Sequence, residues 1–314
     1  MATETIAAPQ SPAPVAPARR PPRELSDRML CGIFVLPTLG VLLLMVAYPF
    51  ISLIYYSTLW FSLLRPAQAP RPVGLGNYEM LLTDPALWER FIFTGKFVLM
   101  TVSVQMVLGI LIAYFLQRDF RGRDIVFTMF MLPMMLCPIV VGFLWRYMFN
   151  SEWGVINAIL SGLGFAKLNW LGIADNALIA VVIADAWMWT PFVILLATAA
   201  FRGIPVSIRE AARIDGASPA FVFFRITLPM SAPILAIALL LRLIDAFKQY
   251  DLFFAMTGGG PGNETMTVSF ELGRIAFRHF HTGLASALAV LMLLIIIGLA
   301  MIFVRRLTAA GREH

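Results

Sequence analysis

Six apolar tracts, each long enough to cross a membrane as a helix, alternate along the chain with short polar segments that hold most of the charges. A transmembrane helix needs about 20 apolar residues to span the hydrocarbon core. No segment alternates between apolar and polar residues as a barrel strand does, so the pattern predicts an all-α polytopic membrane protein. The expected transmembrane helices cover approximately residues 30–58, 97–117, 125–147, 177–201, 227–247 and 282–304.

The composition excludes a soluble domain. Hydrophobic residues make up 60% of the 314 residues and charged residues only 13%, whereas a soluble domain carries roughly 25% charged residues. Cys31 and Cys137 each lie inside an apolar tract, with neither disulfide nor metal-ligand spacing. We therefore expect them to be small core residues.

The distribution of Lys and Arg predicts the orientation in the membrane. With the N-terminus in the cytoplasm, fourteen of the 24 basic residues fall in cytoplasmic segments, clustered at span ends as the positive-inside rule requires. The net charge of +6 therefore indicates topology rather than nucleic-acid binding. We expect a Pro- and Ala-rich disordered tail over residues 1–28, a transmembrane domain over 29–306 and a tail over 307–314, with both tails cytoplasmic.

A polar island over residues 207–229 separates two of the apolar tracts, and its local chemistry predicts two short helices. Ser207-Ile208-Arg209-Glu210 has the pattern of a capping box, with Ser207 as the N-cap. Gly216 supplies the left-handed residue at which such a helix ends. Ser218-Pro219 predicts a second helix start, with Pro219 at the first helical position. We expect this second helix to end near Pro229, and the charge distribution places the hairpin in the cytoplasm.

The polar island resembles the EAA loop of permease subunits of ATP-binding-cassette (ABC) importers. The matching residues are Glu210-Ala211-Ala212, Asp215-Gly216-Ala217 and Leu228-Pro229. Two further segments are similar to those of the carbohydrate-uptake branch of this family, namely Phe120-Arg121-Gly122-Arg123 and Thr257 to Gly262. That branch includes maltose, glycerol-3-phosphate, trehalose and polyol systems. The resemblance covers nearly the whole chain from about Asp27 and implies a multi-pass protein of the bacterial inner membrane.

In that family the EAA loop forms a coupling helix that sits in a cleft of a cytoplasmic ATPase subunit. The resemblance implies that Glu210 anchors the helix, that Ala211 and Ala212 allow close approach, and that the Asp215-Gly216-Ala217 segment shapes the turn. The simpler alternative is that Glu210 only closes its own capping box and Asp215 pairs with a nearby Arg. The chain has no phosphate-binding loop of the form GxxxxGK[ST], so we expect ATP and Mg to bind partner subunits and no cofactor to bind this chain.

The Gly-rich segment Gly258, Gly259, Gly260 and Pro261 falls outside the membrane in this topology. The resemblance implies that it is a docking or gating surface for an external solute-binding protein. The alternative is an ordinary flexible turn between a span and an amphipathic segment. Asn263-Glu264 follows, with no lysine to reach a phosphate, which excludes a nucleotide loop here.

Charged residues inside spans are costly and often mark a transport path or a buried pair. Asp185, Arg242 and Asp245 lie within predicted spans, and sugars suit sites that combine hydrogen-bonding groups with flat apolar rings. Two alternatives stay open: Arg242 and Asp245, three residues apart, form a structural pair, and the tryptophans anchor the span ends. The candidate path residues are Asp185, Trp187, Trp189, Arg242, Asp245, Lys248 and Tyr250.

Two other functions fit the sequence less well. An ion-coupled secondary transporter would use Asp185 for protons or cations, but it gives no reason for the EAA loop. A membrane enzyme could use His279 and His281 as metal ligands, but the sequence supplies neither a third clustered ligand nor a nucleophile with a base. The sequence therefore predicts a non-catalytic, metal-free subunit that imports a sugar, polyol or glycerol phosphate by alternating access. The expected partners are a second permease of a different sequence, two ATPase subunits and a binding protein.

Overall fold

The structure is a computed structural model that describes residue 29, residues 31–64 and residues 69–310. The predicted N-terminal tail lies outside these residues, as do residues 311–314 of the predicted C-terminal tail. The chain divides into two units, residues 1–51 and residues 52–314. In the first unit a π-helical turn, Cys31–Val35, leads into helix α2, Leu36–Ser57, which ends in the second unit.

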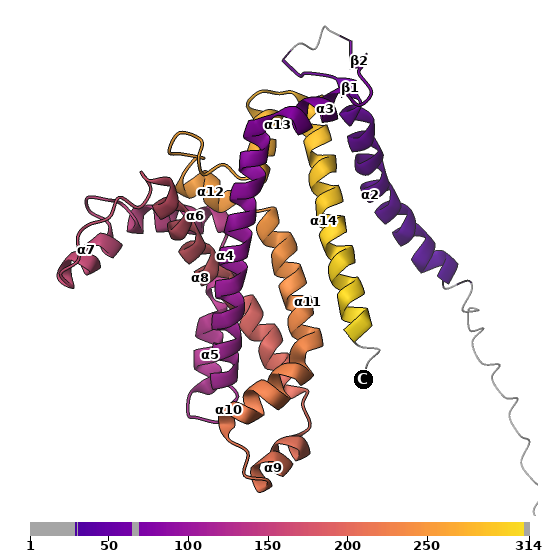
Figure 1. Cartoon of the computed structure of the whole chain (residues 1–314). Helices are drawn as coiled ribbons and strands as arrows, with labels where there is room; N and C mark the ends of the chain where they lie inside the picture. Colours follow the sequence, from indigo (N-terminus) through magenta and orange to yellow (C-terminus); the bar gives the residue numbers. More distant parts are fainter. Residues whose placement is uncertain (1–28, 30, 65–68, 311–314) are drawn as a thin grey trace, which may run out of the picture. The chain divides into compact units, whose positions relative to one another are not determined.

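The second unit is almost entirely helical (Figure 1). Its two short strands pair antiparallel, with Leu59 opposite Pro72 and Trp60 opposite Arg71. Its elements are β1 (Leu59–Trp60), β2 (Arg71–Pro72), α3 (Gly76–Thr83), α4 (Pro85–Phe115), α5 (Arg123–Met131), a 3-10 turn (Pro133–Met135), α6 (Pro138–Met148), α7 (Val155–Gly162), α8 (Ala174–Arg202), α9 (Val206–Ile214), α10 (Pro219–Val222), a π-helical turn (Phe223–Thr227), α11 (Leu228–Phe247), α12 (Asp251–Met256), α13 (Val268–Phe277) and α14 (Thr282–Ala310).

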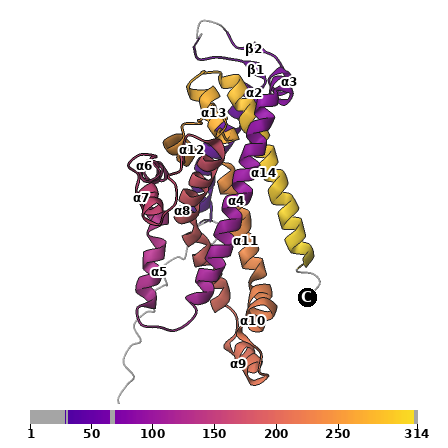
Figure 2. The same cartoon turned by 60° about the vertical axis from the view of Figure 1, so that its left-hand side comes forward.

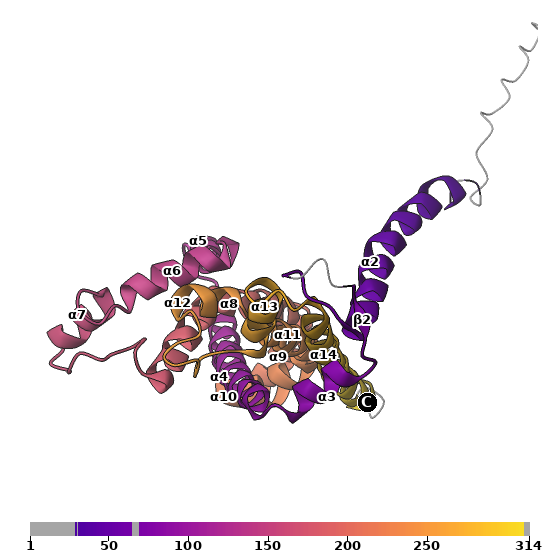
Figure 3. The ribbon, with the colours of Figure 1, turned by 90° about the horizontal axis from the view of Figure 1, so that it is seen from above.

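The long helices α4, α8 and α11 form the centre of the second unit, and α14 packs against α11 and α13 (Figures 1 and 2). Helix α8 is the most enclosed of the candidate spans, since 67% of its most apolar window is buried. It approaches α4 closely at Gly109, where a Cβ atom would lie 2.6 Å from the side chain of Val193. Seen from above, α5, α6 and α7 extend to one side of this group (Figure 3).

The two ends of the second unit differ in character. The α9–α10 hairpin lies at one end, and we call this the hairpin end (Figure 1). The strands, α3 and α13 lie at the opposite end.

The described residues contain five helices that are long and apolar enough to cross a membrane, and a sixth span if the bent pair α5–α6 counts as one. The all-α fold is therefore confirmed. Two span starts expected from the sequence were wrong, and a third expected span is bent.

The span expected over residues 97–117 begins twelve residues earlier. Asp84 caps α4, because its side chain accepts a hydrogen bond from the amide of Ala86 at 2.9 Å, and Pro85 occupies the first helical position. The expected start followed the last charge, Lys96. The helix nevertheless tolerates charges in its first turns, where Arg90 pairs with Glu271 of α13.

The span expected over residues 125–147 is not one straight helix. Its two halves, residues 123–135 and 138–148, meet at an angle of 98°. Pro133 and Pro138 flank the break, and each lacks the backbone donor that would continue the helix. The bend turns α6 toward α12, against which it packs.

The span expected over residues 227–247 begins earlier, because no break separates α10 from α11. The π-helical turn joins them, with the amide of Leu228 bonded to the carbonyl of Phe223, and the helical run covers Pro219–Phe247. The helix expected to end near Pro229 therefore continues into the span. The expectation of buried cysteines was also wrong, since Cys31 and Cys137 are both exposed.

Candidate functional site

The turn of the α9–α10 hairpin has the predicted chemistry. Gly216 has a left-handed φ of +72°. The amide of Ala217 donates to the carbonyl of Ala212, five residues earlier, at 2.9 Å, which is the 6→1 hydrogen bond of a Schellman motif. The hydroxyl of Ser218 accepts a hydrogen bond from the amide of Phe221 at 3.3 Å, and Pro219 is the first helical residue. The predicted stop at Gly216 and restart at Ser218-Pro219 are confirmed.

The predicted capping box at the start of α9 is not formed. The helix begins at Val206, so Ser207 lies in its first turn rather than at the N-cap. The first turn closes instead through the amide of Ile208, which bonds to the carbonyl of Pro205 at 3.2 Å. Glu210 is therefore not a partner in a capping box.

The hairpin exposes a surface that mixes acidic and apolar side chains. Glu210, Ala211, Asp215 and Gly216 are exposed, and Ile214 has 86% of its surface exposed, the largest value among the exposed large hydrophobic residues. Ala212 is buried inside the subunit and Ala217 is half-buried. Glu210 and Ile214 are four residues apart and so share one face of α9. The sequence reasoning missed Ile214, although an apolar residue just before the turn was a usable signal.

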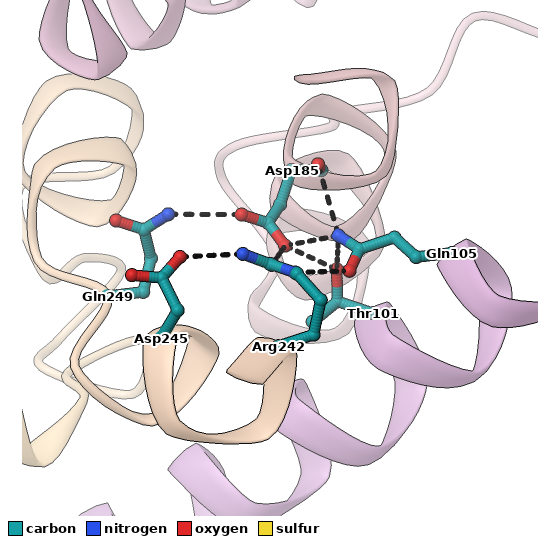
Figure 4. A network of polar contacts seen from close by, with 6 residues as sticks. All are labelled: Thr101, Gln105, Asp185, Arg242, Asp245 and Gln249. Carbon is teal, nitrogen blue, oxygen red and sulfur yellow. Dashed lines mark hydrogen bonds and ion pairs between the residues drawn. The ribbon is translucent and has the colours of Figure 1, made fainter. Parts of the chain in front are cut away.

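A second cluster of polar residues lies inside the bundle, where α4, α8 and α11 meet (Figure 4). Its centre is the carboxylate of Asp185, which is fully buried and 3.0 Å from Nη2 of Arg242, itself 2% exposed. Oδ2 of Asp185 also accepts bonds from Thr101 Oγ1 at 2.6 Å and Gln105 Nε2 at 2.8 Å. Gln249 Nε2 donates to Oδ1 at 3.0 Å. The buried charge is thus paired and fully hydrogen-bonded, as burial requires.

Arg242 connects this buried cluster to the surface of the subunit. Its Nε donates to Gln105 Oε1 at 2.8 Å, and its Nη1 lies 2.6 Å from Oδ2 of Asp245. The guanidinium carbon also lies 5.0 Å from the ring centroid of Trp189, within cation–π range. The side chain of Asp245 is 44% exposed, so one edge of the cluster is open while its centre is closed. We call Thr101, Gln105, Asp185, Arg242, Asp245 and Gln249 the buried polar network.

The structure brings together four of the seven predicted path residues, namely Asp185, Trp189, Arg242 and Asp245. The other three predicted residues lie outside this cluster. Trp187 stacks edge-on against Trp145 at 5.9 Å, and Lys248 is an exposed residue at the end of α11. The ring of Tyr250 stacks on both Phe254 and Phe270, at 5.6 and 5.5 Å.

Three members of the network were not predicted from the sequence. Thr101 and Gln105 are four residues apart in the largely apolar part of α4 that follows Lys96, and this spacing places them on one face. That pattern was a usable signal. Gln249 follows the end of α11 and gave no comparable signal, because only the turn after Phe247 directs its side chain to Asp185.

The Gly-rich segment forms a loop with internal hydrogen bonds at the end opposite the hairpin. Gly258 and Gly259 have φ values of +62° and +89°, which explains the need for glycine. Thr265 Oγ1 bonds to the carbonyl of Gly260 and lies 2.9 Å from Thr257 Oγ1. A groove of about 480 Å³ separates the end of this loop from the first turns of α4. It is lined in part by Glu89, Arg90, Lys96, Asn263 and Glu264.

No three His, Cys, Asp or Glu side chains among residues 29, 31–64 and 69–310 are placed to hold a metal ion. The ring of His281 packs against Trp60 at 5.7 Å.

A bundle of apolar helices with a polar hairpin at one end and a buried charge network defines a polytopic membrane protein. A family model described as binding-protein-dependent transport system inner membrane component matches residues 105–311. The chain belongs to this family.

Similar proteins indicate which branch of this family the chain resembles. The trehalose/maltose transport system permease protein MalF of Thermococcus litoralis is 35% identical over 279 residues, which cover 87% of this chain and 92% of that protein. The sulfoquinovosyl glycerol transport system permease protein SmoG of Agrobacterium fabrum is 32% identical, with 86% and 87% covered. One chain of a bacterial alginate ABC transporter, solved with an alginate-bound periplasmic protein, has the same fold, with a TM-score of 0.76 at 20% identity over 87% and 92% of the two chains.

These findings confirm the resemblance to the carbohydrate-uptake branch of ABC importer permeases. They give no support to the ion-coupled transporter considered as an alternative.

Proposed function

We propose that this chain imports a sugar or sugar-like solute by alternating access, paired with a second permease and driven by two ATPase subunits. The observation that carries the proposal is the exposed hairpin face of Glu210, Ala211 and Ile214 on a chain of this permease family. The similar proteins named for trehalose, maltose and sulfoquinovosyl glycerol support a carbohydrate cargo.

The hairpin face has the properties of a protein contact. An isoleucine with 86% of its surface exposed buries little apolar surface within this chain, and clusters of apolar and charged side chains of this kind are typical of interaction sites. Gly216 and the buried Ala212 fix the angle of the turn, so the face is held in one geometry before any partner binds. We assign this face to the cleft of an ATPase subunit, which places the hairpin end in the cytoplasm.

The orientation is supported by charge. The hairpin end carries Arg118, Arg121 and Arg123 after α4 and Arg202 and Arg209 around α9. Such clustering at span ends is the pattern of a cytoplasmic face. The Gly258–Pro261 loop then lies on the external side, where it serves as the docking surface for the solute-binding protein.

The open edge of the buried polar network supports a solute path beside α11. Asp185 is fully buried and therefore holds the network rather than the solute. Asp245 is partly exposed, and Arg242 fixes its carboxylate at 2.6 Å. A carboxylate held in this way accepts hydrogen bonds from sugar hydroxyls at little cost in side-chain entropy.

The test is replacement of Gly216 by valine, with transport and assembly measured together. A β-branched residue at a φ of +72° is strained by about 1–2 kcal/mol, so the turn changes and the α9 face is displaced. We expect uptake of labelled trehalose and maltose to fall at least tenfold and the ATPase subunit to be lost from the purified complex.

Gly164→Val is the matched control. Gly164 has a φ of +86° with nothing within 4 Å of a Cβ atom, as at Gly216, but it lies in the loop after α7. The control should retain the ATPase subunit. A Gly216→Val complex that keeps its ATPase subunit and its uptake would contradict the proposal.

A further inference from the structure

Helix α4 contacts three separate functional segments along its length. It is one continuous α-helix of 31 residues, Pro85–Phe115, and is therefore about 45 Å long. It has no proline beyond its first residue and no internal break. The segment after the Gly-rich loop, the buried polar network and the hairpin each contact α4 at a different position along its axis.

The first contact is at the end opposite the hairpin. The hydroxyl of Thr94, fully buried, accepts a hydrogen bond at 3.0 Å from the amide of Val268, the first residue of α13. Arg90, one turn earlier on α4, lies 3.4 Å from Glu271 of α13. Since α13 directly follows the Gly-rich loop, these contacts fix the loop segment to α4.

The second contact is in the middle of the helix. Thr101 and Gln105 project from α4 into the buried polar network and bond to Asp185 of α8 at 2.6 and 2.8 Å. Gln105 also accepts the bond from Arg242 of α11. Movement of α4 along its axis by one or two ångströms would break these buried bonds, each of which is costly to leave unmade.

The third contact is with the hairpin. The ring of Tyr114, in the last turn of α4, lies 4.5 Å from that of Phe223, and its hydroxyl is 3.5 Å from the carbonyl of Pro219. Arg209 of α9 reaches Gln117, just after α4, at 3.5 Å. Both segments of the hairpin therefore touch the same end of α4.

We infer that α4 is the element that couples the external loop to the ATPase hairpin, with Thr94 and Tyr114 as its terminal positioning residues. A straight helix displaced at Tyr114 carries Thr101, Gln105 and Thr94 with it, because all four belong to one rigid body. The network in the middle is bonded in this structure, and a displaced α4 would break it. Both ends of α4 therefore bias the equilibrium between the bonded and the displaced position. This inference rests on the proposed function of the hairpin and the loop.

The test measures the response of the loop to ATP in the whole transporter. In a variant with Cys31→Ser and Cys137→Ser, Asn263→Cys places one thiol on the exposed loop. Its rate of labelling by a membrane-impermeant maleimide is measured with and without MgATP and orthovanadate. We expect MgATP and orthovanadate to change the rate at least fivefold.

Thr94→Val and Tyr114→Ala should each abolish this change, while the ATPase subunit still copurifies and its basal ATP hydrolysis stays within twofold. Thr94→Ser, which keeps the hydroxyl, should restore it. Leu99→Ala and Leu111→Ala are matched controls, because both side chains lie on α4 and are 70% and 52% exposed. These controls should keep the full response.

A labelling rate that does not respond to ATP in the parent variant would overturn the inference, and so would a full response in Thr94→Val and Tyr114→Ala. Reduced copurification in one of these variants, with its response to ATP intact, would show that the residue only stabilises the fold and would also overturn it. Failure of the proposed function gives a different result. In that case the ATPase subunit does not copurify with the parent variant, or Gly216→Val leaves assembly unchanged.

Discussion

At the scale of single residues, the position of Asp185 decides how its neighbours respond to substitution. Its carboxylate is fully buried and depends on Arg242 for charge compensation and on Thr101, Gln105 and Gln249 for hydrogen bonds. A buried ion pair adds little net stability compared with apolar residues, but removal of one partner leaves an uncompensated charge.

We therefore expect Arg242→Met to lower the free energy of unfolding by about 3–5 kcal/mol, as for other broken buried pairs. The double variant Asp185→Asn with Arg242→Met should recover part of this loss, because neither charge is left unpaired. Thermal unfolding of the purified transporter in lipid nanodiscs is the measurement. A double variant no more stable than Arg242→Met alone would show that the pair is not the source of the loss.

Asp245→Asn is the control at the open edge of the network. Its side chain is 44% exposed, so its pair with Arg242 is partly screened by solvent. Exposed pairs contribute about 0–1 kcal/mol, and we expect a change in unfolding free energy within that range. Uptake of the sugar solute should fall in this variant despite its normal stability, because Asp245 faces the proposed solute path.

The sequence predicted this site in part. Charged residues in apolar tracts are rare enough to mark Asp185, Arg242 and Asp245 without any structure. The pairing between Asp185 and Arg242 could not be predicted from the sequence, because 57 residues separate them and only the packing of α8 against α11 brings them together. Trp187 and Trp189 have the same chemistry in sequence, yet only Trp189 meets the guanidinium.

At the scale of helices, proline alone does not decide where a span bends. Two prolines in the third apolar tract produce the 98° break between α5 and α6. Pro229 and Pro233 lie in α11 without breaking it, since the preceding π-helical turn and the neighbouring helices accommodate them. Hydropathy alone gave six apolar tracts, which correspond in the described residues to five spanning helices and the bent pair α5–α6. It could not predict which tract is broken at its prolines.

The contact between α6 and α12 gives a prediction at this scale. A Cβ atom on Gly142 of α6 would lie 2.6 Å from the Cβ of Ala255 and 3.5 Å from the Cα of Leu252. Gly142→Leu should therefore force the two helices apart and destabilise the protein by about 1–3 kcal/mol, the usual cost of overpacking. A lower melting temperature of the purified transporter would be the direct sign.

Gly298→Leu on α14 is the appropriate comparison, because nothing lies within 4 Å of its Cβ position. This change should be neutral or stabilising by up to about 1 kcal/mol, since leucine favours helix more than glycine does. Equal melting temperatures for the two variants would mean that α6 and α12 separate without cost.

At the scale of the whole molecule, the exposed side chains at the two ends of the second unit indicate which contacts each end makes. The hairpin end presents Glu210 and Ile214, while the opposite end presents a loop of constrained glycines beside a charged groove. Between them the only buried charges of the transmembrane core, among the described residues, are Asp185 and Arg242, and they are paired. A paired, enclosed acid is poorly suited to exchange protons or cations with solvent, which favours ATP as the energy source.

Proteoliposomes that contain the chain with its permease and ATPase partners should therefore take up the sugar solute only when ATP is enclosed with the ATPase subunits and the solute-binding protein is outside. Collapse of the proton and sodium gradients by ionophores should leave the rate within twofold. A catalytically inactive ATPase subunit serves as the control and should abolish uptake. Uptake that persists without ATP and follows an imposed ion gradient would refute this energy source. Asp185 would then carry the coupled ion, and its pairing with Arg242 would have to open during each cycle.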